Sequence, residues 1–283
     1  MKTPHLNVKI VKLLTIYLRF NMHFLTEKQD DQEREYRIPY HYIADEKKLL
    51  NLPDKLSICP CYLSYLKIVK SLLSPFNGQR VLDAGCGDGR FLFELRDNNL
   101  QLYGVDYSEK AVSFCKILNP KAKIYCSDLT KKTPFSENFF DYITFIETLE
   151  HIEPSEIPNI LNEFKRILKN DGKLIITVPH KNKRLSKKHY QHFDSESLKK
   201  TLYPYFKVEK IYGHFKKSML KLILFYGIMG FYYCTYPLKS FGVNISDKIN
   251  TLGYCFFDKY LSSCEPNSGF RIIAVCKKNF SER

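Results

Sequence analysis

The sequence predicts an α/β fold in which helices cover both faces of a mostly parallel sheet. From Arg80 onward, short apolar segments alternate with amphipathic ones, which is the pattern of successive βαβ units. A glycine-rich turn follows the first apolar segment, Asp106 ends the second, and Asp128 follows the third. Because the carboxyl ends of parallel strands share one edge of a sheet, these features predict a ligand site at that edge.

The individual elements follow from apolar periodicity and from the residues that end each segment. Apolar runs of strand length predict seven strands, at 81–82, 102–105, 123–126, 140–146, 174–178, 206–212 and 270–276. Helical spacing predicts helices at 62–73, 91–95, 108–118, 158–168 and 195–202. Ser108 is the expected N-cap of the third helix, and Asn170-Asp171-Gly172 is expected to stop the fourth.

We expect one domain over 76–283, preceded by an N-terminal extension and helical cap at 1–75. An insertion at 213–269 separates the last two strands and is too long for a structureless loop. Within it, the 17 residues 222–238 carry no charge and predict a helix. A helix of that length reaches about 26 Å, short of a hydrocarbon core of about 30 Å. The segment is therefore expected to form a buried lid or to lie on a membrane surface through 216–239.

The basic charge is concentrated in one part of the chain. Lys and Arg total 44 against 30 Asp and Glu, a formal net charge of +14. Residues 160–221 hold 16 basic and 5 acidic residues, and so +11 of that charge. This fits a solvated surface, or a face that meets nucleic acid, an anionic membrane or an acidic ligand. The nine cysteines lack zinc-type spacing and no secretory signal precedes them, so we expect reduced thiols and a cytoplasmic protein.

The glycine-rich turn reads V-L-D-A-G-C-G-D-G over residues 81–89. Glycines at that place let the backbone bend and let a ligand approach without meeting a Cβ atom. A dinucleotide enzyme is disfavoured, because the third glycine comes one residue early and Asp88 would repel a pyrophosphate at the helix N-terminus. Asp106 stands where a carboxylate can accept from both ribose hydroxyls, and Asp128 where one can accept from an adenine amino group.

These motifs resemble those of the class I S-adenosylmethionine-dependent methyltransferases, and most closely the small-molecule group that includes the ubiquinone-biosynthesis O-methyltransferases. Further support comes from L-Y-G-V-D-Y-S (102–108), D-L (128–129), P-F-S-E-N-F-F-D (134–141), E-T-L-E-H-I (147–152) and L-K-N-D-G-K-L-I-I-T-V-P (168–179). The resemblance implies a Rossmann-like seven-stranded sheet, mostly parallel with an antiparallel last strand, and S-adenosyl-L-methionine as cofactor.

The resemblance also implies which residues bind this cofactor. Its methionyl part, ribose and adenine would each meet the end of a different strand. The implied residues are Asp83, Gly85, Cys86 and Gly87 at the methionyl part, Asp106 at the ribose, Tyr107, Asp128 and Leu129 at the adenine, and Ile146 and Glu147 beside the cofactor.

His151 is the candidate catalytic base, because methyl transfer to oxygen or nitrogen can require removal of a proton. It follows the fourth strand at the edge where the acceptor is expected; the alternative is that it only orders its loop. Glu147, Glu150 and His151 form E-x-x-E-H, a string associated with a divalent metal in some ubiquinone-type enzymes. The same string is widespread in relatives without a metal, so no metal is assigned. His180, His189 and His192 are expected to be structural or to line the acceptor pocket.

The predicted function is methylation of a small-molecule or lipid-linked acceptor. In the lipid-linked case, residues 216–239 would contact the membrane peripherally. Two alternatives stay open: an RNA or protein methyltransferase that uses the basic 160–221 segment, and a non-catalytic domain of the same fold. A nucleic-acid acceptor is disfavoured, because no RNP-like motif and no Trp accompany the lysines.

Overall fold

The strands form one seven-stranded sheet of order β3-β2-β1-β4-β5-β7-β6. The computed structural model describes residues 34, 36, 39, 59–73, 78–235 and 245–280. Five strands pair in parallel: β1 (Arg80–Ala84), β2 (Gln101–Asp106), β3 (Lys123–Cys126), β4 (Phe140–Ile146) and β5 (Leu168–Pro179). β7 (Gly269–Lys278) lies between β5 and β6 (Phe206–Lys216) and runs antiparallel to both. This confirms the predicted mixed sheet with an antiparallel last strand.

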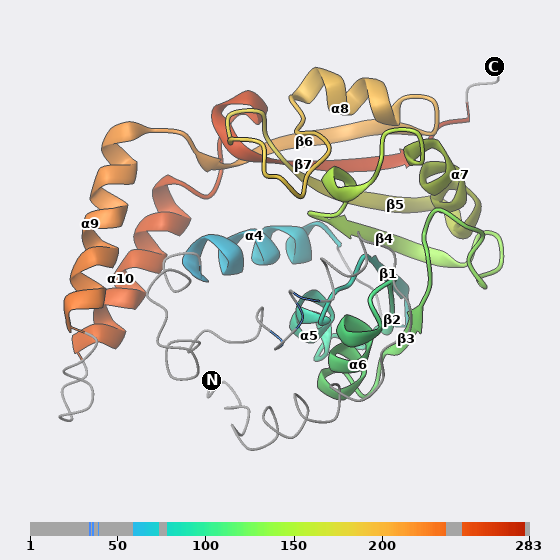
Figure 1. The fold of residues 1–283 in the computed structure, drawn as a ribbon, viewed down its shortest axis with the longest axis horizontal. Coiled ribbons are helices and arrows are strands. Elements are labelled where there is room, and N and C mark those ends of the chain that lie inside the picture. Colours follow the sequence, from blue (N-terminus) through green and yellow to red (C-terminus); the bar gives the residue numbers. More distant parts are fainter. Residues whose placement is uncertain are drawn as a thin grey trace.

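Helices cover both faces of the sheet, as predicted (Figure 1). One face packs against α4 (Cys59–Leu72), α5 (Arg90–Leu95) and α6 (Glu109–Leu118), through a core that includes Val69, Leu92 and Val112. The other face packs against α7 (Ile157–Ile167) and α8 (Ser195–Leu202), through a core that includes Phe164 and Leu198. The parallel strands are therefore buried on both sides, which explains their nearly continuous apolar sequences.

The strand register brings the predicted ligand residues to one edge of the sheet. Ala84 pairs with Val105, Asp106 with Cys126, and Ile146 with Thr177. The glycine-rich turn and the loops after β2, β3 and β4 consequently begin side by side.

Most predicted element boundaries agree with the structure within a few residues, but the stop signal after α7 was misread. The helix ends at Ile167, and β5 begins at Leu168. Asn170-Asp171-Gly172 lies inside β5, where the register with β4 jumps from Phe140–Leu168 to Tyr142–Lys173. The turn residues are thus absorbed as an irregularity in the strand pairing. Ser108 is confirmed as the α6 N-cap, since its Oγ accepts from Ala111 N at 3.1 Å.

The insertion folds into two helices, α9 (Met219–Thr235) and α10 (Ile245–Tyr260), which project from one end of the sheet (Figure 1). Phe225, Met229 and Phe257 are buried between them. The outer side of α9 exposes Leu220, Ile223 and Phe231 by 61–70%, and whether the helix acts as a lid stays a prediction. No helix in the described ranges has both the length and the apolar character needed to cross a membrane.

The predicted N-terminal extension lies mostly outside the described residues, and so do residues 236–239 of the predicted membrane contact. Within 1–75, α4 packs on the sheet through Tyr65, Leu66 and Val69. Tyr36 is buried against α6, beside Phe114 and Leu118. The division of the chain at residue 76 stays a prediction.

Candidate functional site

The glycine-rich turn leaves no space for a side chain at Gly85, Gly87 or Gly89. Gly85 has φ +70, and a Cβ atom there would lie 2.6 Å from the Thr148 side chain. Gly87 has φ +55, and its Cβ atom would lie 2.6 Å from the Tyr36 hydroxyl. Both positions therefore require glycine for conformation and for close approach. Neither Tyr36 nor Thr148 was predicted to contact the turn, because no local pattern links them to it.

Asp106 ties the glycine-rich turn to the end of β2. Its side chain is buried, with one oxygen accepting from Gly87 N at 2.8 Å and the other from Ser108 N at 3.0 Å. A carboxylate is an acceptor-only group, which is the chemistry that ribose hydroxyls require. Asp106 thus shapes the turn and presents a fixed acceptor at the sheet edge.

The side chains of Asp83 and Cys86 face the interior beneath the turn. Asp83 accepts from Thr144 Oγ1 at 2.8 Å, joining β1 to β4. Burial raises the pKa of Asp83 to about 7, against the opposing effect of the Thr144 hydrogen bond. Cys86 is buried, with its Sγ 4.0 Å from that of Cys115. Asp83 and Cys86 therefore pack beneath the glycine-rich turn and support it.

The predicted adenine residues line the same edge after β2 and β3. Asp128 is half-buried and accepts from Thr130 N at 2.9 Å and from Thr130 Oγ1 at 2.7 Å. Burial raises its pKa, but the Thr130 hydrogen bonds and Lys131 outweigh burial, so the net shift is downward and the carboxylate stays charged. The Leu129 side chain is buried in the core beside Tyr103, whereas Tyr107 is half-buried.

Glu147 is held in an uncommon conformation where β4 ends. It has φ 45, in the left-handed region, and its carboxylate lies 2.9 Å from Nε of Arg271 on β7. Its N–H donates to Thr177 O at 3.0 Å, and Ile146 before it packs on the core. Arg271 was not predicted, because only the insertion of β7 beside β5 brings it here. Such strain is concentrated at functional sites.

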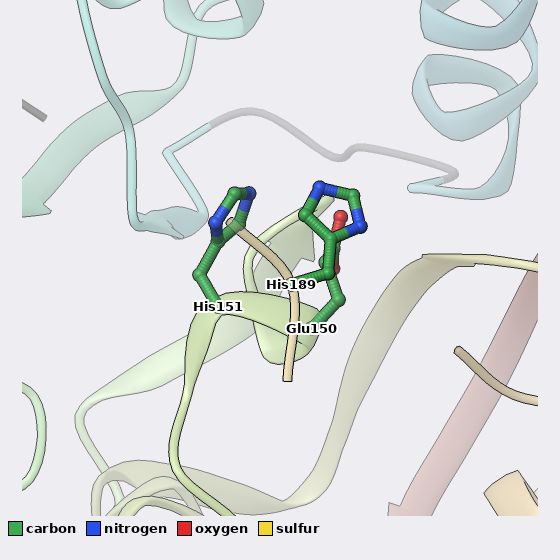
Figure 2. Close-up of side chains that lie close together, drawn as sticks. All are labelled: Glu150, His151 and His189. Carbon is green, nitrogen blue, oxygen red and sulfur yellow. The ribbon is translucent and has the colours of Figure 1, made fainter. Parts of the chain in front are cut away.

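Glu150, His151 and His189 converge beside that strand end (Figure 2). Glu150 and His151 belong to the one-turn helix η3 (Leu149–His151), and His189 belongs to the loop after β5. One potential ligand atom from each residue lies within 4.8 Å of those of the other two. The backbone bond from Tyr190 N to Glu150 O, 2.8 Å long, joins the two segments.

His189 continues into a chain of hydrogen bonds. Its Nδ1 lies 2.7 Å from His192 Nε2, and His192 Nδ1 lies 3.0 Å from the Lys183 carbonyl oxygen. Burial and the neighbouring His151 and His192 lower the pKa of His189 to about 4, so its ring is neutral at pH 7. His180 lies elsewhere: its Nδ1 accepts from Asn182 N and its Nε2 contacts Asn267, which orders the loop.

Comparison with known proteins agrees with this geometry. Residues 82–176 match the family described as a methyltransferase domain. This match covers about a third of the chain. This stretch holds the glycine-rich turn, Asp106, Asp128 and the Glu150–His151 segment. The fold around it is that of solved S-adenosylmethionine-dependent methyltransferases, as predicted.

The curated relatives match only part of the chain. An uncharacterized protein of Methanocaldococcus jannaschii is 31% identical over 150 residues, covering 52% of this chain and 59% of its own. An uncharacterized methyltransferase of Synechocystis is 32% identical over 104 residues, covering 37% of this chain and 49% of its own. The chain therefore spans about half the length of these relatives.

A solved structure matches nearly the whole chain. Phosphoethanolamine N-methyltransferase 2 of Haemonchus contortus, in complex with S-adenosyl-L-methionine, aligns over 90% of this chain and 60% of its own, with a TM-score of 0.56 and 16% identity. At that identity the likeness concerns the fold. The chain places a sharp glycine turn with positive φ beside a buried carboxylate at the adjoining strand end, which suits a ribose-bearing cofactor.

Proposed function

We propose that the protein transfers a methyl group from S-adenosylmethionine to a small-molecule or lipid-linked acceptor. The observation that carries the proposal is the arrangement at one sheet edge. There, the Gly85–Gly87 turn and Asp106 stand next to a cluster of titratable side chains at the end of β4. The turn and Asp106 suit the cofactor, and the cluster of titratable side chains suits an acceptor that must lose a proton.

The cofactor supplies an activated methyl group when bound. The chain must align the acceptor for in-line attack and exclude water, and alignment of this kind accounts for much of the rate. Gly85 and Gly87 give the turn beside the cofactor its sharp bend, and Asp106 accepts from the ribose. The ion pair between Glu147 and Arg271 fixes the wall between cofactor and acceptor.

His151 is proposed to take the acceptor's proton as the new bond to the methyl carbon forms. It lies half-buried after β4, with its ring centroid 4.6 Å from that of His189. The likeness to the ubiquinone-type group favours an oxygen acceptor, whose proton such a base would remove.

A lipid-linked acceptor is supported by the outer side of α9. Leu220, Ile223 and Phe231 are exposed there, and Lys216, Lys217 and Lys221 precede or begin the helix. Apolar side chains beside lysines suit the boundary between acyl chains and anionic headgroups.

The test is transfer of a tritiated methyl group from labelled S-adenosylmethionine into a fractionated cell extract. We expect label in the small-molecule or lipid fraction. Label in RNA or protein would instead identify the macromolecular alternative. Cofactor binding without transfer into any fraction would favour a non-catalytic domain.

A further inference from the structure

The junction between the α9–α10 hairpin and the sheet encloses a histidine that the proposed chemistry does not use. His214 lies near the end of β6 and has no exposed surface. Neither of its ring nitrogens forms a hydrogen bond with any described residue. We propose that His214 makes this junction an acid-sensitive hinge, in which protonation of the imidazole releases the hairpin while the central strands of the sheet stay folded.

His214 stands where three elements meet. Its ring centroid lies 5.9 Å from that of Tyr65 on α4 and 5.7 Å from that of Phe257 on α10. In the ladder between β6 and β7 it is the register partner of Arg271. The imidazole is therefore packed at the point where α4 and the hairpin both rest on the sheet (Figure 1).

The backbone beside this histidine has the features of a hinge. Phe215 has φ 59, in the left-handed region that a bulky side chain rarely adopts. Gly213 exchanges two backbone hydrogen bonds with Cys264, and Lys216 N donates to Leu261 O at 2.8 Å. The chain therefore enters and leaves the hairpin through a few hydrogen bonds around one strained residue.

The surroundings of His214 oppose a positive charge. Burial, and then the neighbouring Arg271, lower the pKa of His214 well below its usual range. An aromatic face can stabilise a cation, but the Arg271 guanidinium already lies over the Tyr65 ring, 4.6 Å from the ring centroid. The same guanidinium pairs with Glu147. A protonated His214 would thus add a second cation to a buried aromatic pocket that already holds one.

The remaining titratable groups around the junction do not supply a counter-ion. The acidic group on α10, Asp258, is held by Lys67 of α4 at 3.0 Å, and Glu265 is exposed. The charged and titratable side chains of the elements packed here are Tyr65 and Lys67 on α4, Tyr254 and Asp258 on α10, Cys264 and Glu265 after α10, Lys216 on β6 and Arg271 on β7.

The sign of the pH effect follows from the difference between the closed and the open hairpin. In the closed form His214 stays neutral, whereas in the open form it reaches water and takes up a proton below its ordinary pKa of about 6.5. Opening therefore binds a proton, and the closed hairpin loses stability as the pH falls below about 6.5. Residues 193–283 contain no other histidine, so no other imidazole of the hairpin titrates in that range.

The hinge bears on the proposed function without depending on it. The α9 helix carries the exposed apolar side chains of the proposed membrane contact, and Arg271 pairs with Glu147 at the strand end beside the acceptor site. Acidification would thus free α9 to move relative to that site. Opening is measured without cofactor, acceptor or lipid, so either proposal can fail while the other stands.

The test is native-state hydrogen exchange of the full chain at pH 7.5 and pH 5.5, read at the amides of α9 and α10 and corrected for intrinsic exchange rates. In the wild type we expect the opening constant of these amides to rise about tenfold between the two pH values, while β4 and β5 stay protected. His214→Phe keeps an aromatic ring and removes the titration, so its opening constant should change less than about twofold.

His180→Gln is the matched control, because His180 is also buried but is hydrogen-bonded to Asn182 and Asn267. This variant should keep the tenfold rise. NMR of histidine-labelled wild type makes the test independent of how well the variants fold: the His214 ring should stay neutral down to about pH 5 in the folded protein. A titration midpoint near 6.5 for His214, an equal rise in His214→Phe, or no rise in the wild type would overturn the proposal.

Discussion

Gly87 meets two physical demands at once, a positive φ and the absence of a Cβ atom. We expect Gly87→Ala to lower the free energy of unfolding by about 1–3 kcal/mol and to weaken S-adenosylmethionine binding at least tenfold. Gly78→Ala is the matched control, because Gly78 has φ +81 but nothing within 4 Å of its Cβ position. Denaturant unfolding should show the smaller loss for Gly78→Ala, and Tyr36→Phe should partly rescue Gly87→Ala. Equal losses at both glycines would exclude the steric part of the argument.

His151 is the residue on which the proposed proton transfer depends. Its replacement by alanine should lower turnover about 10²- to 10⁴-fold, with cofactor affinity nearly unchanged. Single-turnover kinetics with the acceptor found in the extract assay would measure this. Wild-type turnover in His151→Ala would return the residue to a structural role.

At the scale of elements, the charged side chain of Glu163 links α7 to the loop before β4. Glu163 pairs with Arg166 at 2.6 Å and accepts from Thr133 N at 2.8 Å. Burial raises the pKa of Glu163, but the hydrogen bonds from Arg166 and Thr133 outweigh burial and lower it overall. The contribution of Glu163 to the free energy of unfolding is therefore fully present above the unfolded-state pKa of about 4.3. It is lost as the pH falls through the lower pKa of the folded state.

We expect the free energy of unfolding to fall more between pH 6 and pH 3 in the wild type than in Glu163→Gln, by about 1 kcal/mol. Urea unfolding at both pH values measures this difference. Glu153→Gln is the control, since Glu153 is exposed. Parallel pH profiles for the wild type and Glu163→Gln would contradict the assignment.

The α9 helix carries the proposed membrane contact. We expect the protein to sediment with anionic liposomes at low salt, and less so at high salt, because headgroup attraction is screened. Replacing Leu220 and Ile223 by serine, or Lys216, Lys217 and Lys221 by glutamate, should reduce the sedimented fraction several-fold. Ile117→Ser, an exposed apolar residue on α6, should not change it. A wild-type protein that stays in the supernatant at low salt would favour a soluble acceptor.

At the scale of the whole molecule, the sequence predicted what depends on local pattern. The seven strands, the helices on both faces and the site edge follow from periodicity and from the residues that end each strand. The Glu147–Arg271 pair, the Tyr36 contact with Gly87 and the His189–His192 hydrogen bonds were not predicted. Each joins residues far apart in the chain or depends on side-chain orientation, which spacing alone does not determine. Asn170-Asp171-Gly172 was misread because a turn sequence can also be accommodated within an irregular strand pair.

The central claim is that the edge built by the glycine-rich turn and Asp106 binds S-adenosylmethionine. Titration calorimetry with the wild type, Asp106→Ala and Glu109→Ala tests it most directly. Asp106→Ala removes charge-assisted hydrogen bonds, each worth about 1.5–3 kcal/mol, so its affinity should fall at least tenfold while circular dichroism shows a folded protein. Glu109, exposed three residues later, should be replaceable without effect. Unchanged cofactor affinity in a folded Asp106→Ala protein, or no binding by the wild type, would contradict the account.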